Sequence, residues 1–400
     1  MKKVFAVLLA VAMILTFAAC GKKASGDAIK VGMVCIGNAN QAYDRNFYSA
    51  ADNAKKILAK EGINVEWVYT YDHPEGDPVA ADCEELADAG CIAVVLNSYG
   101  MEPAMLTVAA DYPDTIFVSC TNETSKSDDL ENTVNAMPAI QEGRYLAGVA
   151  AGCKLQEMID NGEIKADEAV IGYVGAYTYA EVVSGYTAFF LGARSQCPSA
   201  TMMVEFIGSW GDTTLERNAA QDLIDKGAVL ISQHSDNTSP ATTAQENGVY
   251  HVGYNISMSD VAPKASIISS RIDWTNYFVY LIKTIVNGGT VDADYFGHGL
   301  KAGDVCLEEI NTKIAAKDTK KAIEEAQKAI EAGTLQVFDT SAFTVGGAEL
   351  TSSLVDMNAD FAPDEGYEAV FDGAYHESYF KSAPAFAERI DGITLLNEEY

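Results

Sequence analysis

The stretch IKVGMVCIGNANQAYDRNFYSAADNAKKILAK, from Ile29 to Lys60, decides the fold. It opens with a mostly apolar, β-rich run, IKVGMVCIG, which predicts a strand buried on both faces. A polar loop follows, and a helical pattern then runs from Phe47 to Lys60 and stops before Gly62. A buried strand, a loop and a helix in this order are the repeating unit of a parallel sheet with helices on both faces.

The same unit recurs along the chain. Helical patterns at Thr214–Lys226 and Asp318–Ala332 again stop before glycines. Such repeats imply right-handed crossovers, so we expect an α/β fold with two doubly wound, Rossmann-like lobes. The further predicted strands are VEWVYTY (from Val65), CIAVVLN (Cys91), TIFVSCT (Thr115), AVIGYVG (Ala169), MMVEFIG (Met202), AVLISQ (Ala228), VYHVGYN (Val249) and ASIISSR (Ala265).

The length of 400 residues also favours two lobes over one core. No long Pro/Gly/Ser linker separates the halves, so we expect short hinge segments beside a cleft that the carboxyl ends of the strands face. The final stretch is expected to be β-rich, with turns at Asp372-Gly373 and Asp391-Gly392. The expected division is lobe 1 at about 29–137 with part of 255–290, lobe 2 at about 138–254 with part of 291–342, and an extension at 343–400 packed on a lobe.

The first residues resemble an export signal. Lys2 and Lys3 precede an apolar run to Ala19 that is too short to span a bilayer comfortably. Small residues directly before Cys20 are typical of a bacterial lipobox, so Cys20 is the expected lipidation site at the cell membrane, with residues 20–28 as a tether. The alternative is a plain signal peptide cleaved near Ala19.

Composition excludes several classes of function. The formal net charge of −30 argues against nucleic acid as a partner, because phosphate binding needs basic patches. Apart from Cys20, seven cysteines are widely spaced, without C-x-x-C pairs or a His/Cys cluster at zinc spacing, so we expect no metal site and leave one disulfide open. No G-x-S-x-G, P-loop, H-E-x-x-H or G-x-G-x-x-G motif indicates an enzyme or a cofactor.

Aromatic and polar side chains follow the predicted strands, where a cleft would lie. Asp44 and Phe47 come after the first strand, although Phe47 is alternatively a core anchor. His234 and Asp236 follow the AVLISQ strand, either as ligand contacts or as loop polar groups. Aromatic rings among small polar residues at strand ends predict a lined pocket. The other strand-end candidates are Ser98, Tyr99, Tyr177 and Trp210.

Taken together, several segments resemble the basic membrane protein (BMP) family of ABC-transporter substrate-binding lipoproteins, which are related to purine nucleoside receptors. The resemblance implies a type I periplasmic-binding-protein fold with three hinge crossings, an extracytoplasmic location, ABC permease partners and no catalysis. The segments are NSYGMEP (from Asn97), EGRYLAGVAAG (Glu142), IGYVGAYTYAEVVSGYTAFFLGA (Ile171), AAQDLIDKGAVLISQHSD (Ala219) and GVYHVGYNISMSDVAPKA (Gly248).

The resemblance also implies a ligand, a purine nucleoside or base held between aromatic rings. Asp44 and Phe47 match the family's acidic-then-aromatic opening, and Trp210 matches a cleft aromatic of the second lobe. Asn255 stands where nucleoside-binding members have a ribose-binding aspartate, and SSRIDW, ending at Trp274, lacks a clear ribose-contacting lysine. Nucleoside and free base therefore both remain open. The alternatives are a receptor for a sugar or another small polar ligand, and a signalling lipoprotein that kept the binding fold.

Overall fold

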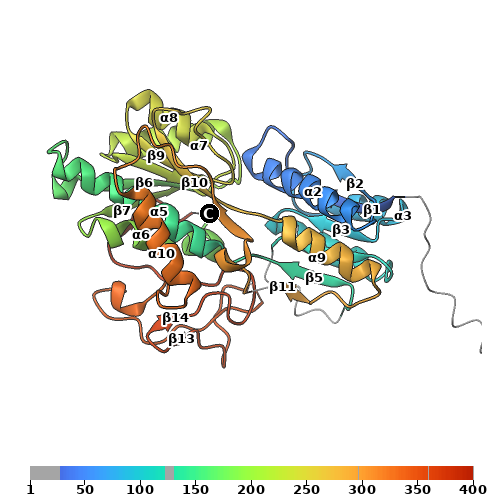
Figure 1. Ribbon diagram of the computed structural model, residues 1–400. Helices are drawn as coiled ribbons and strands as arrows, with labels where there is room; N and C mark the ends of the chain where they lie inside the picture. Colours follow the sequence, from blue (N-terminus) through green and yellow to red (C-terminus); the bar gives the residue numbers. More distant parts are fainter. Residues whose placement is uncertain (1–27, 122–129, 296, 359, 400) are drawn as a thin grey trace, which may run out of the picture.

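The computed structural model describes residues 28–121, 130–295, 297–358 and 360–399. The expected signal peptide, Cys20 and nearly all of the tether lie outside these residues. The described chain forms two α/β lobes side by side, with a third, irregular segment beneath one of them (Figure 1). Within the described part, no helix is both long and apolar enough to cross a membrane.

Lobe 1 is built on a six-stranded parallel sheet in the order β11-β5-β4-β3-β1-β2. One face is covered by α2 and α9, and the other by α3 and α4, so both faces are buried. The strands are β1 (Ile29–Val34), β2 (Val65–Thr70), β3 (Ala93–Leu96), β4 (Ile116–Ser119), β5 (Thr133–Ala136) and β11 (Asp294–Tyr295); the helices are α2 (Ala42–Lys60), α3 (Val79–Asp88), α4 (Glu102–Ala109) and α9 (Thr275–Val286).

Lobe 2 is built on a seven-stranded sheet in the order β12-β10-β9-β8-β6-β7-β15. Its strands are parallel except for β12, which pairs antiparallel with β10. The strands are β6 (Val170–Gly175), β7 (Thr201–Phe206), β8 (Leu230–Gln233), β9 (Tyr250–Tyr254), β10 (Ser266–Ile272), β12 (Val305–Leu307) and β15 (Ile393–Leu395); the helices are α5 (Ile140–Asp160), α6 (Ala180–Gln196), α7 (Thr213–Asp225), α8 (Ser239–Asn247) and α10 (Thr319–Glu331).

Glycines let α5 and α6 pack backbone against backbone in lobe 2. A Cβ on Gly148 would lie 1.9 Å from the carbonyl oxygen of Phe189, and one on Gly192 would lie 2.0 Å from that of Tyr145. Real Cβ atoms do not approach that closely, so any side chain here would force the helices apart. The EGRYLAGVAAG segment is thus a packing motif of the lobe 2 core.

The chain crosses between the lobes three times. It leaves lobe 1 between β5 and α5, returns between β10 and α9, and leaves again between β11 and β12. The first two crossings take only residues 137–139 and 273–274, and both run between the lobes in Figure 1. This is the topology of type I periplasmic-binding proteins, and it allows the lobes to move as rigid bodies about a hinge.

The C-terminal extension, residues 343–399 of the described chain, packs on lobe 2 and is mostly irregular. The expected β-structure is present but short: β13 (Val370–Phe371) and β14 (Ala374–Tyr375) form a hairpin, and β15 is an edge strand of the lobe 2 sheet. The Asp372-Gly373 turn joins these two strands with φ of 49° and 79°. Gly392 makes no hairpin, because β15 after it pairs parallel with β7. The seven described cysteines are all unpaired.

Candidate ligand-binding cleft

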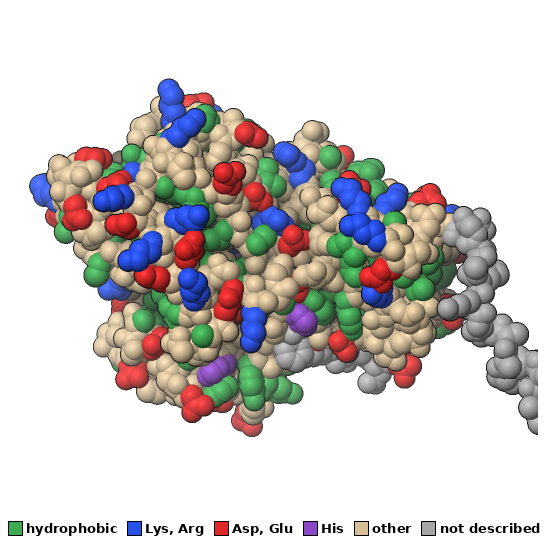
Figure 2. All heavy atoms as spheres, in the orientation of Figure 1, with side chains coloured by type: hydrophobic (Ala, Val, Ile, Leu, Met, Phe, Trp, Pro, Cys, Tyr) green, Lys and Arg blue, Asp and Glu red, His purple; other side chains and the backbone are tan. Residues whose placement is uncertain are grey.

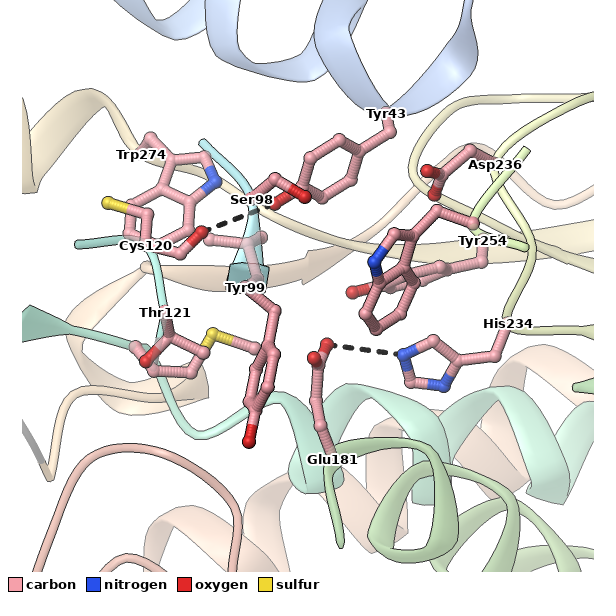
Figure 3. Close-up of a pocket in the computed structure, with 13 residues that line it drawn as sticks. Tyr43, Ser98, Tyr99, Cys120, Thr121, Glu181, His234, Asp236, Tyr254 and Trp274 are labelled. Atoms are coloured by element: carbon pink, nitrogen blue, oxygen red, sulfur yellow. Dashed lines mark hydrogen bonds and ion pairs between the residues drawn. The ribbon is translucent and has the colours of Figure 1, made fainter. Parts of the chain in front are cut away.

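A cavity lies between the lobes, where the carboxyl ends of both sets of strands meet (Figure 3). From lobe 1 it is lined by Tyr43 at the start of α2, by Ser98 and Tyr99 after β3, and by Thr121 after β4. Lobe 2 contributes side chains that follow β7, β8 and β9 and the start of α6; these are Trp210, His234, Asp236, Tyr254 and Glu181. The space between these side chains, counted out to its open mouth, is about 440 Å³.

The lobes are closed on each other around this cavity. The backbone N–H of Ala42 in lobe 1 donates to the carbonyl oxygen of Asp236 in lobe 2, at 3.2 Å. The rings of Tyr99 and Tyr179, one from each lobe, stack with centroids 4.7 Å apart and planes 17° apart. Contacts of this kind cannot survive separation of the lobes, so the structure is the closed state of the hinge.

Aromatic rings from both lobes form the walls. Trp274, carried into lobe 1 by the second crossing, and Tyr43 lie on one side in Figure 3, and Tyr254 lies on the other. The Tyr43 hydroxyl donates to the carbonyl oxygen of Asn97 at 2.6 Å, which fixes its ring. The buried Arg144 guanidinium lies 3.4 Å from the centroid of the Tyr254 ring and fixes that ring by a cation–π contact. The walls are therefore preorganised for a planar or apolar ligand surface.

Carboxyl groups give the cavity its polar character. Burial, followed by the charges of Asp44 and Glu216, raises the pKa of Asp236 well above its ordinary value. Glu181 lies 3.2 Å from Nε2 of His234, and burial lowers the pKa of His234 to about 4. His234 is therefore neutral at pH 7, and the Nε2–H tautomer is the one that can donate to Glu181. None of the described lining residues is Lys or Arg, so the site favours ligands rich in hydrogen-bond donors over anions.

Among the residues that the structure describes, no group of three or more His, Cys, Asp or Glu side chains could hold a metal ion. On the face shown in Figure 2, basic side chains are scattered among acidic ones over both lobes. Neither observation indicates a second ligand class for the cleft.

Comparison with known proteins decides the family. Residues 29–337 match the Bmp family model, described as ABC transporter substrate-binding protein PnrA-like. The chain belongs to the Bmp family. As a Bmp protein it is a substrate-binding protein of an ABC transporter, and proteins of this family bind small molecules and work with ABC permeases.

Its relatives carry names that refer to different ligands. The Bmp chain is 29% identical to a purine-binding protein of Brucella abortus, over 82% of this chain and 88% of that protein. It is also 29% identical to an ABC transporter glucose-binding protein, TsgA13 of Haloferax volcanii, over 81% of this chain and 77% of that protein. A solute-binding protein of Aeropyrum pernix shares the fold with a TM-score of 0.63 at 16% identity, over 78% of this chain and 93% of that one.

Of the predicted site residues, five line the cavity of this Bmp protein: Ser98, Tyr99, Trp210, His234 and Asp236. Tyr177 stands one layer back, its ring centroid 5.1 Å from that of Trp210. The Asp44 carboxylate instead accepts from the N–H of Gly37 at 3.2 Å and from Nδ2 of Asn97 at 2.9 Å, which shapes the loop after β1.

Two residues that the sequence predicted as ligand contacts lie in the protein interior instead. Phe47 is fully buried and stacks on Trp274 with centroids 4.9 Å apart, so it supports a cavity wall from behind. Phe47 is thus a core residue, which is the alternative role that the sequence left open for it. Asn255 is 98% buried with φ of 71°, and its N–H donates to the carbonyl oxygen of Ser270 at 2.9 Å, so it shapes the end of β9 outside the cavity lining.

Four residues that the sequence did not predict also line the cavity: Tyr43, Glu181, Tyr254 and Trp274. The sequence could have indicated two of them as site residues. Tyr43 follows the predicted strand that starts at Ile29, and Tyr254 lies near the end of the predicted strand that starts at Val249. Glu181 opens a helix without a polar N-cap bond, and Trp274 reaches the cavity through a hinge crossing. Neither of these two positions can be read from strand ends alone.

Proposed function

We propose that this Bmp protein binds a purine nucleoside or purine base in the interlobe cleft and delivers it to an ABC permease. The observation that carries the proposal is an interlobe cavity lined by aromatic rings, Tyr43 and Trp274 from lobe 1 and Trp210 and Tyr254 from lobe 2. Rings facing a slot from two sides suit a flat heteroaromatic ligand, because every base has a π-face on which an aromatic ring can stack.

The carboxyl groups support the same ligand class. Purines carry ring N–H and exocyclic amino groups, and Asp236 and Glu181 supply acceptors at the cavity surface. A buried acceptor left unpaired penalises ligands that lack the matching donor. The relative of Brucella abortus whose name describes purine binding adds independent support.

A sugar is the second candidate. Carboxylates beside aromatic rings also suit hydroxyl groups, and the relative from Haloferax volcanii is named for glucose binding. The two candidates differ in ultraviolet absorbance, because sugars lack the purine chromophore. Mass spectrometry of ligand released from the purified protein, with calorimetry using guanosine, adenosine, guanine, adenine and glucose, separates them. Tight binding of glucose with none of the four purines would replace the proposal by the sugar reading.

We further propose that the protein acts without turnover, held on the extracytoplasmic face of the cell membrane through lipid on Cys20. Nucleosides incubated with the protein are expected to return intact while raising its melting temperature by mass action. Free base that appears at a rate proportional to protein concentration would identify an enzyme instead.

A further inference from the structure

The C-terminal extension is fixed firmly to lobe 2. Its Phe386 is fully buried in the lobe 2 core, stacked on Phe338 with centroids 4.4 Å apart and planes 8° apart. Asn397 exchanges two hydrogen bonds with the backbone of Phe206, at 2.8 and 2.9 Å. With β15 paired to β7 as well, the extension must move with lobe 2 when the hinge opens.

The same extension also bonds to lobe 1, through Ser382. The Ser382 N–H donates to Oδ2 of Asp294 at 2.9 Å, and the Ser382 Oγ accepts from Nδ2 of Asn135 at 2.8 Å. Asp294 lies on β11 and Asn135 on β5, both strands of the lobe 1 sheet. All three residues are more than 90% buried, so water competes poorly for these bonds. In Figure 1 the extension lies beneath lobe 2 and approaches β11.

The lobe 1 end of this contact continues into the ligand cavity. Oδ1 of Asn135 accepts from the Thr121 hydroxyl at 2.9 Å, and Thr121 lines the cavity. A chain of hydrogen bonds therefore runs from Ser382 through Asn135 to the cavity wall. The extension also borders the cleft directly, since Tyr99 lines both the ligand cavity and a groove formed with Leu354 and Lys381 of the extension.

We propose that the extension is an interlobe latch, in which Ser382 adds a noncovalent tie to the three covalent crossings and biases the ligand-free hinge toward its closed state. The extension belongs to lobe 2, whereas Asn135 and Asp294 belong to lobe 1, so the two Ser382 bonds oppose a change in the angle between the lobes. The matched family model ends at residue 337, before the extension begins. The latch is accordingly an addition to the two-lobed receptor.

Small-angle scattering of the ligand-free protein tests the latch without knowledge of the ligand. Ser382→Ala removes the Oγ acceptor, and Ser382→Ala combined with Asp294→Ala removes both contacts. Because the two interlobe hydrogen bonds of Ser382 are lost, we expect the ratio of closed to open molecules in the double variant to fall by about 5- to 150-fold. The radius of gyration should rise accordingly, with a smaller rise for Ser382→Ala alone.

Ser352→Ala is the matched control, because Ser352 Oγ donates to Glu368 within the extension and bonds to neither lobe. It should scatter as the parent does. Circular dichroism and melting temperature establish that each variant is folded; if the double variant fails, Ser382→Ala alone decides. A folded Ser382 variant whose ligand-free scattering curve superimposes on that of the parent overturns the latch. That result would leave the proposed ligand untouched.

Discussion

The N–H of Ala42 lies 3.2 Å from the carbonyl oxygen of Asp236, and this bond joins the first turn of a lobe 1 helix to a lobe 2 loop. The first N–H groups of any helix lack intrahelical partners. Closure of the cleft therefore satisfies a donor that water must satisfy in the open state. The helix that carries Tyr43 into the cavity is in this way held by the opposite lobe.

Trp210 should contribute directly to ligand affinity. We expect Trp210→Ala to weaken purine binding by about 5- to 150-fold, since stacking on one ring is worth roughly 1–3 kcal/mol. Isothermal calorimetry with guanosine and adenosine measures the effect. Tyr71→Ala is the control, because Tyr71 is 49% exposed and lies outside the cavity lining. Unchanged affinity in a folded Trp210 variant would remove stacking from the model.

Phe47 should contribute more to the stability of the fold than to ligand affinity. Its ring is fully buried against Trp274, so Phe47→Ala is expected to lower the free energy of unfolding by about 3–5 kcal/mol through the cavity it leaves. Denaturant unfolding measures this loss. A variant that keeps the parental midpoint while losing purine affinity would instead place Phe47 at the ligand.

Asp236 should make stability depend on pH. Its folded pKa is raised, mainly by burial, so ionisation costs the folded state more than the unfolded chain. Its contribution is therefore intact below the unfolded pKa of about 4 and declines as pH rises above it. Asp236→Asn removes this loss. The melting temperature of the variant relative to the parent should rise from pH 4 to pH 8, and parallel melting curves across that range would contradict the assignment.

Gly148 should not tolerate even a methyl group. Intrinsic helix propensity predicts that Gly→Ala stabilises an exposed helix by about 1 kcal/mol. Here the new Cβ would lie 1.9 Å from the Phe189 carbonyl oxygen, so we expect destabilisation by about 1–3 kcal/mol from overpacking. Thermal melting of Gly148→Ala gives the sign, and a gain in melting temperature would mean that α5 and α6 separate without cost.

Cys20 should determine membrane association. Cys20→Ser is expected to leave a folded, ligand-binding protein that fractionates away from membranes and lacks the mass of attached acyl chains. Fractionation with intact-protein mass spectrometry tests this. Membrane association and mass that do not change on substitution would favour a plain cleaved signal.

Most of the fold was predictable because parallel strands that are buried on both faces have near-continuous apolar sequences. Each of the nine predicted strands overlaps an observed one. The strands β5, β11 and β12 escaped prediction. For β11 and β12 the reason is that two or three residues carry no periodicity and that their pairing depends on the hinge crossings. The start of α2 at Ala42 was also missed, because its N-cap residue, Gln41, makes no side-chain cap bond.

The site was predictable to the extent that it follows strands. Trp210, His234 and Asp236 come directly after apolar runs, and all three line the cavity. The sequence predicted Phe47 at the cleft, whereas Tyr43 lines it, and the reason is geometric. Residues four apart share a helix face, so both rings point the same way, and only the true start of the helix tells which one reaches the cleft.

The position of β15 lets residues 393–395 protect one edge of the lobe 2 sheet. Residues 393–395 cover β7, which would be the outermost strand of lobe 2 without them. An uncovered parallel edge offers its backbone groups to any other chain. A polypeptide that stopped before Asp391 would keep every strand around the ligand yet expose a template for aggregation. Pairing with β15 thus limits the backbone groups that β7 leaves free at this edge.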